Sequence, residues 1–577
     1  MSVQHAEPEG RWCREHATPP VRPGPRRKAR AAGRQWARAE LTELLTTLLT
    51  DPDTVSAADT LQLRLAAMDP PVRHRNVHLL VRGLPLEHEA RARAFARCLV
   101  RTGHSRQAVC IGLALLARIG EPEDVPDLET LGLLRDLVGP VVHALDTMDK
   151  RAAALLFLRN QEEAPELRGL LAALGAGDDR AVRERLAALP RTMGPEIVRR
   201  AAEASWMQQL LRSDVPAAED SGPLITPRPG NAALLAQAGW MLFLMARARD
   251  YSPEILLYRE AVPAHESFAR GARHLAPTLD HYALLLSAVQ ELRSGPVVLH
   301  DWGPGQREAL LSELVTVLDR AEWRAVVDRD GEDAGGRRRT EWARRVRRQL
   351  SHGQDGPVEG LRIEITDRDP ADPATVETRI LVDGRPLVPE VFGRGPAHSP
   401  EWLLDSGRLR AAEEPREVQL AEAHCTEGCC GALYVTVRRD GGAVVWSDWR
   451  CPAPPPSPLH VRKIPELRFD AAAYDAEISR AENDHTWTWP ARRAARLIAA
   501  GLRERPELLT RWGVELYWAS TDFRDPDQTV VYLRDAGGEG SPNYYKWCVP
   551  EDGTPPEGRA ADALSRLATV DPRTYEA

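Results

Sequence analysis

The chain has little of several residue types, and each shortage narrows the class of protein. Lysine occupies only four of its 76 basic positions, residues 28, 150, 463 and 546, so arginine supplies nearly all the positive charge. Eight cysteines in 577 residues argue against the disulfide framework of small secreted proteins. The residues after Met1 are polar and form no apolar segment, which predicts a cytoplasmic protein without a signal peptide.

Long apolar runs and common catalytic patterns are also missing from the sequence. The most apolar stretch, residues 232–246, contains Gln237 and is shorter than the ~20 residues of a bilayer span, so we expect a buried helix and no membrane. No Gly-x-Ser-x-Gly, His-Glu-x-x-His or P-loop occurs, and Gly393-Arg-Gly395 lacks the spacing of a dinucleotide fingerprint. The sequence favours a non-catalytic protein without deciding the question.

The composition that is present predicts several folded domains. A chain of this length holds about three or four domains of roughly 150 residues, and 43% apolar residues are enough for their cores. The net charge of −8 argues against general coating of nucleic acid, although a local basic patch can still bind phosphate. We expect a basic disordered arm at 1–36, a helical repeat domain at 37–213, a linker at 214–230, a second helical domain at 231–351 and an α+β domain at 358–577.

The helical part contains an internal repeat. The segment Gly120-Glu-Pro-Glu-Asp-Val-Pro126-Asp-Leu128 is answered 39 residues later by Glu162-Glu-Ala-Pro165-Glu-Leu167, and an apolar helix follows each copy. This spacing is close to that of two-helix solenoid repeats, and the region resembles HEAT-like repeats. The resemblance implies stacked helices with a long exposed surface, which such proteins commonly use to hold another macromolecule.

The second helical domain is predicted to end in a basic amphipathic helix. Trp342, Val346 and Leu350 recur at intervals of four, which places them on one apolar stripe. The arginines around this stripe are Arg337, Arg338, Arg339, Arg344, Arg345, Arg347 and Arg348. One interpretation is contact with nucleic acid or another polyanion. The alternative is that the helix docks through Trp342 while its arginines face water or neighbouring carboxylates.

From about residue 358 the hydrophobic period changes to two, which predicts a mainly antiparallel sheet. Strands are expected at 361–365, 378–382, 385–388, 417–420, 433–437, 443–447, 514–519 and 529–533, with helices at about 470–483 and 490–504. Asp383-Gly384 and Asp440-Gly441 are strong signals for two-residue hairpin turns. The fold class is therefore multidomain, with helical blocks followed by an α+β domain.

The cysteines gather between residues 424 and 451. If Asp440 and Gly441 form the turn, residue 439 pairs with 442, and the same register places Cys430 opposite Cys451. Two sulfurs at cross-strand distance can share a metal or be oxidised to a disulfide. The candidate zinc ligands are Cys425, Cys429, Cys430, Cys451 and His424, with His460 and Cys548 as further choices for the fourth position. Buried structural thiols are the other interpretation.

The Cys-Thr-x-Gly-Cys-Cys-Gly stretch also resembles one found in uncharacterised actinomycete proteins, and the resemblance implies no activity. A weaker candidate is an acid/base pair of Asp484 and His485, near Trp487, that would work with Asp448. A structural histidine beside aromatic residues is the commoner case.

These patterns lead to three functional hypotheses. The first is a binding or scaffold protein that holds an unknown protein partner on its helical-repeat surface, with Zn²⁺ or thiols in the C-terminal domain. The second is a nucleic-acid-associated protein that binds through the arm at 1–36 and the helix at 337–348. The third is a metal-dependent or thiol enzyme.

Overall fold

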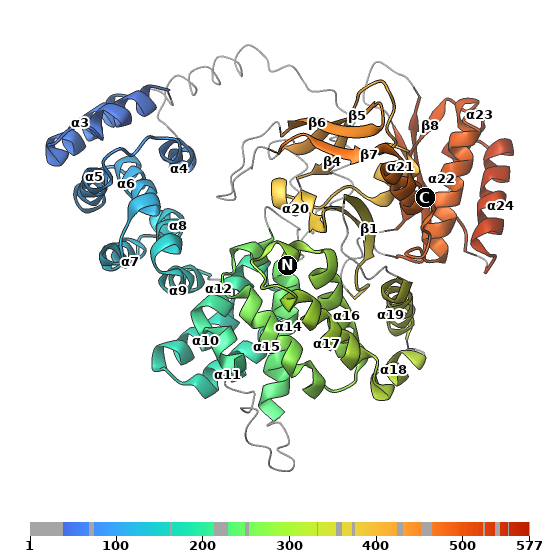
Figure 1. The fold of residues 1–577 in the computed structure, drawn as a ribbon, viewed down its shortest axis with the longest axis horizontal. Coiled ribbons are helices and arrows are strands. Elements are labelled where there is room, and N and C mark those ends of the chain that lie inside the picture. Colours follow the sequence, from blue (N-terminus) through green and yellow to red (C-terminus); the bar gives the residue numbers. More distant parts are fainter. Residues whose placement is uncertain are drawn as a thin grey trace. The chain divides into compact units, whose positions relative to one another are not determined.

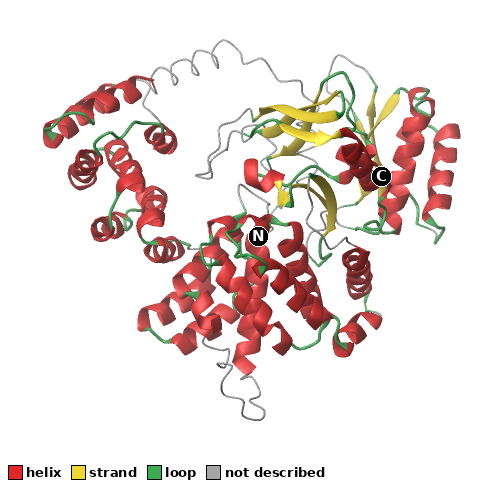
Figure 2. Ribbon diagram, in the orientation of Figure 1, coloured by secondary structure: helices red, strands yellow, loops and turns green. Residues whose placement is uncertain are grey.

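A computed structural model gives the fold of the protein as two compact units, one ending at Met245 and the other beginning at Ala246. The structure describes residues 39–68, 74–161, 164–212, 229–247, 253–329, 331, 333–352, 360–371, 376–423, 431–451, 464–522, 525–536, 543–551 and 553–575. The predicted order of helical blocks followed by an α+β region is confirmed, as Figure 2 shows.

The first unit is built from helices alone in its described residues. After a helix over residues 39–48 come α3 (Thr54–Ala67), α4 (His74–Arg82), α5 (Glu89–Thr102), α6 (Arg106–Ile119), α7 (Val125–Leu131), α8 (Val138–Met148), α9 (Lys150–Arg159), α10 (Pro165–Ala176), α11 (Asp179–Ala187), α12 (Pro195–Ser205), α13 (Met207–Arg212) and α14 (Pro229–Ala246). Capping residues and prolines mark the N-terminal ends of several of these helices. Asp53, Ser105 and Asp149 accept hydrogen bonds from the first-turn backbone of α3, α6 and α9, and proline opens α10 and α12.

Helices of the first unit pack against both their immediate and their next-but-one neighbours in the chain. Helix α6 contacts α4, α5 and α8, and α9 contacts α7, α8 and α12 (Figure 1). Helix α6 is buried nearly all round because apolar residues occupy most of its positions, and Cys110 lies in this core. The run at 232–246 also forms the predicted buried helix, α14, in which Gln237 satisfies its side chain by donating to the carbonyl of Leu189, 2.9 Å away.

Each copy of the internal repeat contains more than two helices. Its first copy begins α7 and continues into α8, and its second copy begins α10 and continues into α11. A third helix follows each pair, α9 in the first copy and α12 in the second. The repeat of about 40 residues therefore contains three helices in the described chain, because each helix is short.

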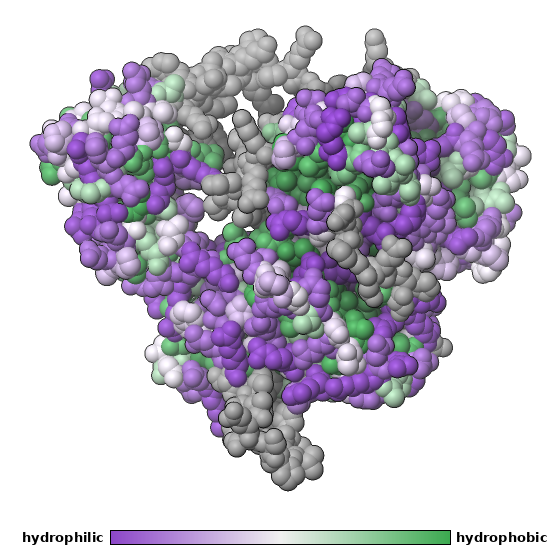
Figure 3. All heavy atoms as spheres, in the orientation of Figure 1, coloured by the Kyte–Doolittle hydropathy of each residue, from purple (hydrophilic) through white to green (hydrophobic). Residues whose placement is uncertain are grey.

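The second unit places helices before and around three small antiparallel sheets. Its helices are α15 (Ala261–Gly271), α16 (Leu279–Ser294), α17 (Gln306–Leu318), α18 (Ala321–Asp328), α19 (Ala334–His352), α20 (Leu387–Val391), α21 (Ala471–Asn483), α22 (Pro490–Glu504), α23 (Glu507–Thr510) and α24 (Pro556–Thr569). Among the residues described, no helix in either unit is both long and apolar enough to cross a membrane. On the face drawn in Figure 3, hydrophilic side chains cover most of the helical surface.

Each sheet of the second unit is antiparallel and follows chain order. The first sheet contains β1 (Leu361–Asp367), β2 (Val376–Val382) and β3 (Arg385–Pro386). The second sheet contains β4 (Arg416–Glu422), β5 (Ala432–Asp440), β6 (Ala443–Arg450) and β7 (Leu467–Asp470). The third sheet contains β8 (Val514–Thr521), β9 (Thr529–Asp535) and β10 (Tyr544–Cys548). The first two sheets share one core with α20 and α21. The third packs its core against α22, α23 and α24.

One predicted hairpin turn is confirmed and the other is displaced. Asp383 and Gly384 connect β2 to β3 with φ of 50° and 74°, the left-handed geometry that a tight hairpin turn requires. In the next hairpin Asp440 pairs with Ala443, so the loop is Gly441-Gly442 and the predicted pairing of residues 439 and 442 is wrong. The glycine, not the aspartate, adopts the positive φ of 59° because it has no Cβ.

Candidate anion-binding cleft

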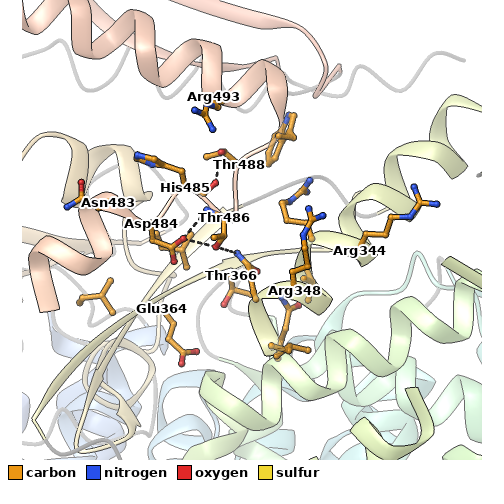
Figure 4. Close-up of a pocket in the computed structure, with 18 of the residues that line it drawn as sticks. Arg344, Arg348, Glu364, Thr366, Asn483, Asp484, His485, Thr486, Thr488 and Arg493 are labelled. Atoms are coloured by element: carbon orange, nitrogen blue, oxygen red, sulfur yellow. Dashed lines mark hydrogen bonds between the residues drawn. The ribbon is translucent and has the colours of Figure 1, made fainter. Parts of the chain in front are cut away.

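A cleft with a volume of about 1130 Å³, lined mostly by charged and polar residues, opens within the second unit. One wall is the C-terminal half of α19, the floor is β1, and the opposite wall is the segment from the end of α21 to the start of α22 (Figure 4). Residues from the end of α16 and the start of α24 complete the lining. The cleft therefore collects elements that lie more than 250 residues apart in the sequence, from Gln290 to Glu557.

Helix α19 is fixed in place by its apolar stripe. Trp342 and Val346 are fully buried, and the indole Nε1 of Trp342 donates to the carbonyl of Asp367 at the end of β1, 2.9 Å away. Burial of a tryptophan of this kind is worth several kcal/mol, about 3–5 when it is truncated to alanine. Because the helix is anchored in this orientation, Arg344, Arg345 and Arg348 line the cleft.

Most arginines predicted to contact a polyanion interact with neighbours in the chain. Arg345 donates through Nε to Asp367 Oδ2, 3.0 Å away, and Arg344 through Nε to the carbonyl of Val327, 2.7 Å away. Further ion pairs of the helix join Arg338 to Asp527, Arg339 to Asp369 and Asp280, and Arg347 to Asp319. Arg337 and Arg348 also interact with neighbouring groups. The helix is thus docked through both its apolar stripe and its charges.

Guanidinium groups outnumber carboxylates in the lining. Its arginines are Arg293, Arg344, Arg345, Arg348, Arg362, Arg480 and Arg493, and its carboxylates are Glu341, Glu364, Asp484 and Glu557. Counted by side chain, the lining holds seven arginines and four carboxylates. Three of these arginines also pair with carboxylates just outside the lining, Arg345 with Asp367, and Arg362 and Arg480 with Glu477. Some of these charges pair with one another, such as Arg293 with Glu364 at 3.2 Å and Arg493 with Glu557 at 2.5 Å. Arg493 and Glu557 are both about half exposed, where an ion pair contributes little and exchanges partners at low cost.

The loop between α21 and α22 is held by its own polar groups. Asp484 Oδ1 accepts from the backbone N–H of Thr486 at 2.9 Å and from its hydroxyl at 2.6 Å, which stabilises the turn. Arg496 Nη1 donates to His485 Nδ1, 3.0 Å away. Burial lowers the pKa of His485, and Arg496 and Arg493 lower it further, so the imidazole is neutral near pH 7.

The structure brings only part of the predicted acid/base group together. Asp484 and His485 both line the cleft, whereas Asp448 lies on β6 and is not among the lining residues. Trp487 and Trp489 have structural partners, because their indole nitrogens donate to the carbonyls of Asp484 and Pro526. In this arrangement Asp484 stabilises the loop by accepting hydrogen bonds from Thr486, and His485 accepts a hydrogen bond from Arg496.

The cysteine stretch falls largely outside the described residues. The structure does not describe His424, Cys425, Cys429, Cys430 and His460. Cys451 is described, and it is half-buried and directly follows β6. The predicted position of Cys451 opposite Cys430 is not supported by the observed register of β5 and β6. Tyr434 pairs with Arg450, so continuing by one residue sets Cys451 level with Leu433 and not with Cys430. Cys548 ends β10 in a different sheet. The described residues contain no group of three or more His, Cys, Asp or Glu arranged to hold a metal.

No protein-family model, curated protein or solved structure matches the chain. The resemblance to HEAT-like repeats therefore rests on the sequence pattern of 120–186. Four arginines of the cleft, Arg293, Arg362, Arg480 and Arg493, were not predicted from the sequence, because they lie on four different elements and only the fold brings them to one surface.

Proposed function

We propose that the protein is a non-catalytic binding protein whose arginine-lined cleft holds an anionic part of a macromolecular partner. The observation that carries the proposal is the gathering of guanidinium groups from α16, α19, β1, α21 and α22 around one cleft. Arginine binds carboxylates and phosphates through paired N–H donors, and several such groups around one concavity favour a partner with several negative charges.

The helical first unit supplies a second binding surface under this proposal. Its helices pack on their next-but-one neighbours, as in solenoid proteins, and this supports the HEAT-like interpretation of the sequence. Such a surface would hold a protein partner while the cleft takes an acidic portion of it. The structural zinc site proposed at Cys425, Cys429, Cys430, Cys451 and His424 would then stabilise the C-terminal part.

Binding of nucleic acid through α19 is the competing proposal. It is supported by the exposed position of Arg348 and by the half-buried Arg344 one turn before it. It is weakened by Arg345 and Arg347, whose guanidinium groups already pair with Asp367 and Asp319. Release of those pairs would leave carboxylates without partners and would reduce the gain from binding phosphate.

A salt titration distinguishes these proposals. Fluorescence anisotropy of labelled poly-glutamate and of labelled duplex DNA would be measured with the full chain over a range of salt concentrations. We expect poly-glutamate to bind at low salt, with affinity falling as salt rises, and DNA to bind more weakly. Double substitution of Arg348 and Arg493 by alanine should weaken poly-glutamate binding by about tenfold or more.

The matched control is Arg180→Ala, which removes an arginine on α11 that pairs with Glu184 and is 90% exposed. Removing this arginine makes the net charge of −8 one unit more negative but leaves the cleft unchanged, so the affinity should stay close to that of the parent protein. Equal losses for the control and the cleft variant would indicate non-specific charge attraction. Absence of binding to either polymer at low salt would refute the proposed function.

A further inference from the structure

The floor of the cleft is an unpaired sheet edge. Strand β1 has β2 on one side and no strand on the other among the described residues. In an antiparallel pair, residues alternate between those that bond to the partner strand and those whose N–H and C=O point away from it. The N–H of Ile363 donates to Glu477 Oε1 and its carbonyl accepts from Arg480 Nη2, both at 2.6 Å, so Ile363 points away from β2.

Ile365 belongs to the same outward set. The register of β1 and β2 runs without a bulge from Leu361 to Asp367, so residues two apart present their backbone groups to the same side. The carbonyl of Asp367 also points outward, where Trp342 and Gln290 donate to it at 2.9 and 3.2 Å. Ile365 lies between these two occupied positions and lines the cleft. Within the described chain, neither its N–H nor its C=O has a hydrogen-bond partner outside the β1–β2 pair.

We propose that the cleft binds an extended acidic segment of a partner protein, whose backbone pairs with Ile365 and whose carboxylates face the arginines. This inference rests on the proposed function and names the chemistry of the occupant. An extended peptide presents one N–H and one C=O side by side, and it is the natural complement of a single outward-pointing strand residue. A nucleic-acid backbone offers acceptors for the N–H of Ile365, but its phosphates carry no donor for the carbonyl.

The arginines are placed to hold side chains on either side of that contact. Arg344 and Arg348 lie on α19, whereas Arg493 lies on α22 beyond the loop that carries His485, as Figure 4 shows. Alternate residues of an extended peptide point to the same side, so acidic residues at every second position would face one wall. Because Ile363 and Asp367 already have side-chain partners, only one residue of the peptide pairs with the strand. Most of the affinity therefore comes from the charges.

The test uses a labelled synthetic peptide that alternates glutamate and valine, together with one version methylated at every glutamate nitrogen and one methylated at every valine nitrogen, because a repeating peptide can shift by two residues past a single methyl group. Methylation removes N–H donors and leaves the charge unchanged. We expect the parent peptide to bind the full chain and one of the two methylated versions to bind about tenfold more weakly. Replacing glutamate by lysine should abolish binding.

The outcomes separate the inference from the proposed function. If every methylated peptide binds as tightly as the parent while the lysine version does not bind, anion binding stands and the pairing with Ile365 is refuted. If neither peptide nor poly-glutamate binds but duplex DNA does, the occupant is nucleic acid and the inference is overturned. If no anionic probe binds, both proposals fail.

A protein variant provides the reciprocal test. Ile365→Pro removes the outward N–H without removing a ladder hydrogen bond, since proline is tolerated on an edge strand whose N–H faces away from its partner. Ile365→Val keeps the N–H and serves as the matched control. We expect about tenfold weaker peptide binding for the proline variant and no change for the valine variant. If the proline variant does not fold, as judged by circular dichroism, the methylated peptides alone decide the matter.

Discussion

Arg379 on β2 and Glu291 on α16 form an ion pair closed to solvent, with Nη2 and Oε1 2.6 Å apart and both side chains less than 5% exposed. Arg379 also donates to the carbonyl of Gln290, 2.8 Å away. Burial alone would raise the pKa of the adjacent Glu377, but Arg379 and Arg368 lower it below its usual value. One guanidinium thus joins the helical part of the second unit to the sheet of β1, β2 and β3.

Replacement of Arg379 by alanine should strongly destabilise the second unit. It leaves Glu291 and Glu377 buried with too few partners, which costs about 3–5 kcal/mol in the free energy of unfolding. Urea denaturation followed by circular dichroism measures this loss. The control is Arg385→Ala, which breaks the partly exposed pair with Glu390 and should cost less than about 1 kcal/mol. Similar small losses in both variants would contradict a structural role for the buried pair.

The buried His265 should make stability depend on pH. Its Nδ1–H donates to the carbonyl of Ala261, 2.7 Å away, and burial lowers its pKa to about 4. The unfolded chain has a histidine pKa near 6.5, so it binds more protons than the folded chain between these values. Stability from this residue is therefore complete above pH ~6.5 and falls as the pH decreases to ~4, by about 3 kcal/mol.

Substitution of His265 by glutamine removes this titration. We expect the difference in unfolding free energy between pH ~7 and pH ~4.5 to shrink in the variant, as measured by urea midpoints. His300, whose pKa burial also lowers, contributes in the same direction and should leave a residual dependence. Exposed His88 replaced by glutamine is the control. An unchanged pH dependence in the His265 variant would show that its protonation is not linked to unfolding.

The hairpin loop between β5 and β6 offers a test of the observed register. Gly441 adopts φ of 59°, a conformation that costs an alanine about 1–2 kcal/mol, whereas Gly442 is not in this region and an added Cβ meets no atom within 4 Å. Gly441→Ala should therefore lower the free energy of unfolding by about 1 kcal/mol or more, and Gly442→Ala should be nearly neutral. The reverse order, in thermal or urea unfolding, would place the turn elsewhere.

The proposed zinc site makes a prediction about metal content. Protein purified without added metal should contain about one Zn²⁺ per chain, and Cys451→Ser should release it and lower the melting temperature, since structural zinc contributes to folding. Cys98→Ser is the matched control, because Cys98 lies on α5 beside Thr102 and away from the cysteine stretch in the sequence. A metal-free protein whose thiols all titrate as free after denaturation under non-reducing conditions would refute both the zinc and the disulfide hypotheses.

Periodicity and capping were enough to predict much of the fold. Helix α22 runs from Pro490 to Glu504, the span that its opening proline and amphipathic pattern predict. The strands β1, β2, β4, β5, β6, β8 and β9 were expected, while β7, β10 and α24 were not. The strand expected at 385–388 is shorter, because β3 ends at Pro386 and α20 begins at Leu387. The two missed strands are at most five residues long, too short for their alternation to stand out from the background.

The displaced hairpin shows where the pattern of hydrophobic residues stops being informative. The expected and observed registers of β5 and β6 near the turn differ by two residues, and a shift of two keeps every side chain on the same face of the sheet. Val437 is buried in either register. Only the turn discriminates, and Asp440-Gly441 and Gly441-Gly442 are both good turn sequences. The bulge that leaves Asp448 with φ of 51° then shifts the pairing once more.

The cleft could not be predicted from sequence patterns, because its lining residues come from separate elements of the chain. The arginines of α19 stood out because they are consecutive, yet most of them serve internal ion pairs. Arg293 and Arg493 are separated by 200 positions in the chain, and only the folded structure places both of them in the lining of one cleft. No sequence pattern marks Ile365 as a binding residue, since its proposed role depends on the direction of its backbone N–H and C=O.

The side chains that cover the rim of β1 also limit how the protein can associate with itself. An open sheet edge recruits strands from other molecules, and this is a route to fibrils. Here Glu477 and Arg480 hold the backbone of Ile363, and Trp342 and Gln290 hold the carbonyl of Asp367. A second chain would find a single residue to pair with, too short a stretch to nucleate a growing sheet, so the same edge that can accept a short ligand is closed to polymerisation.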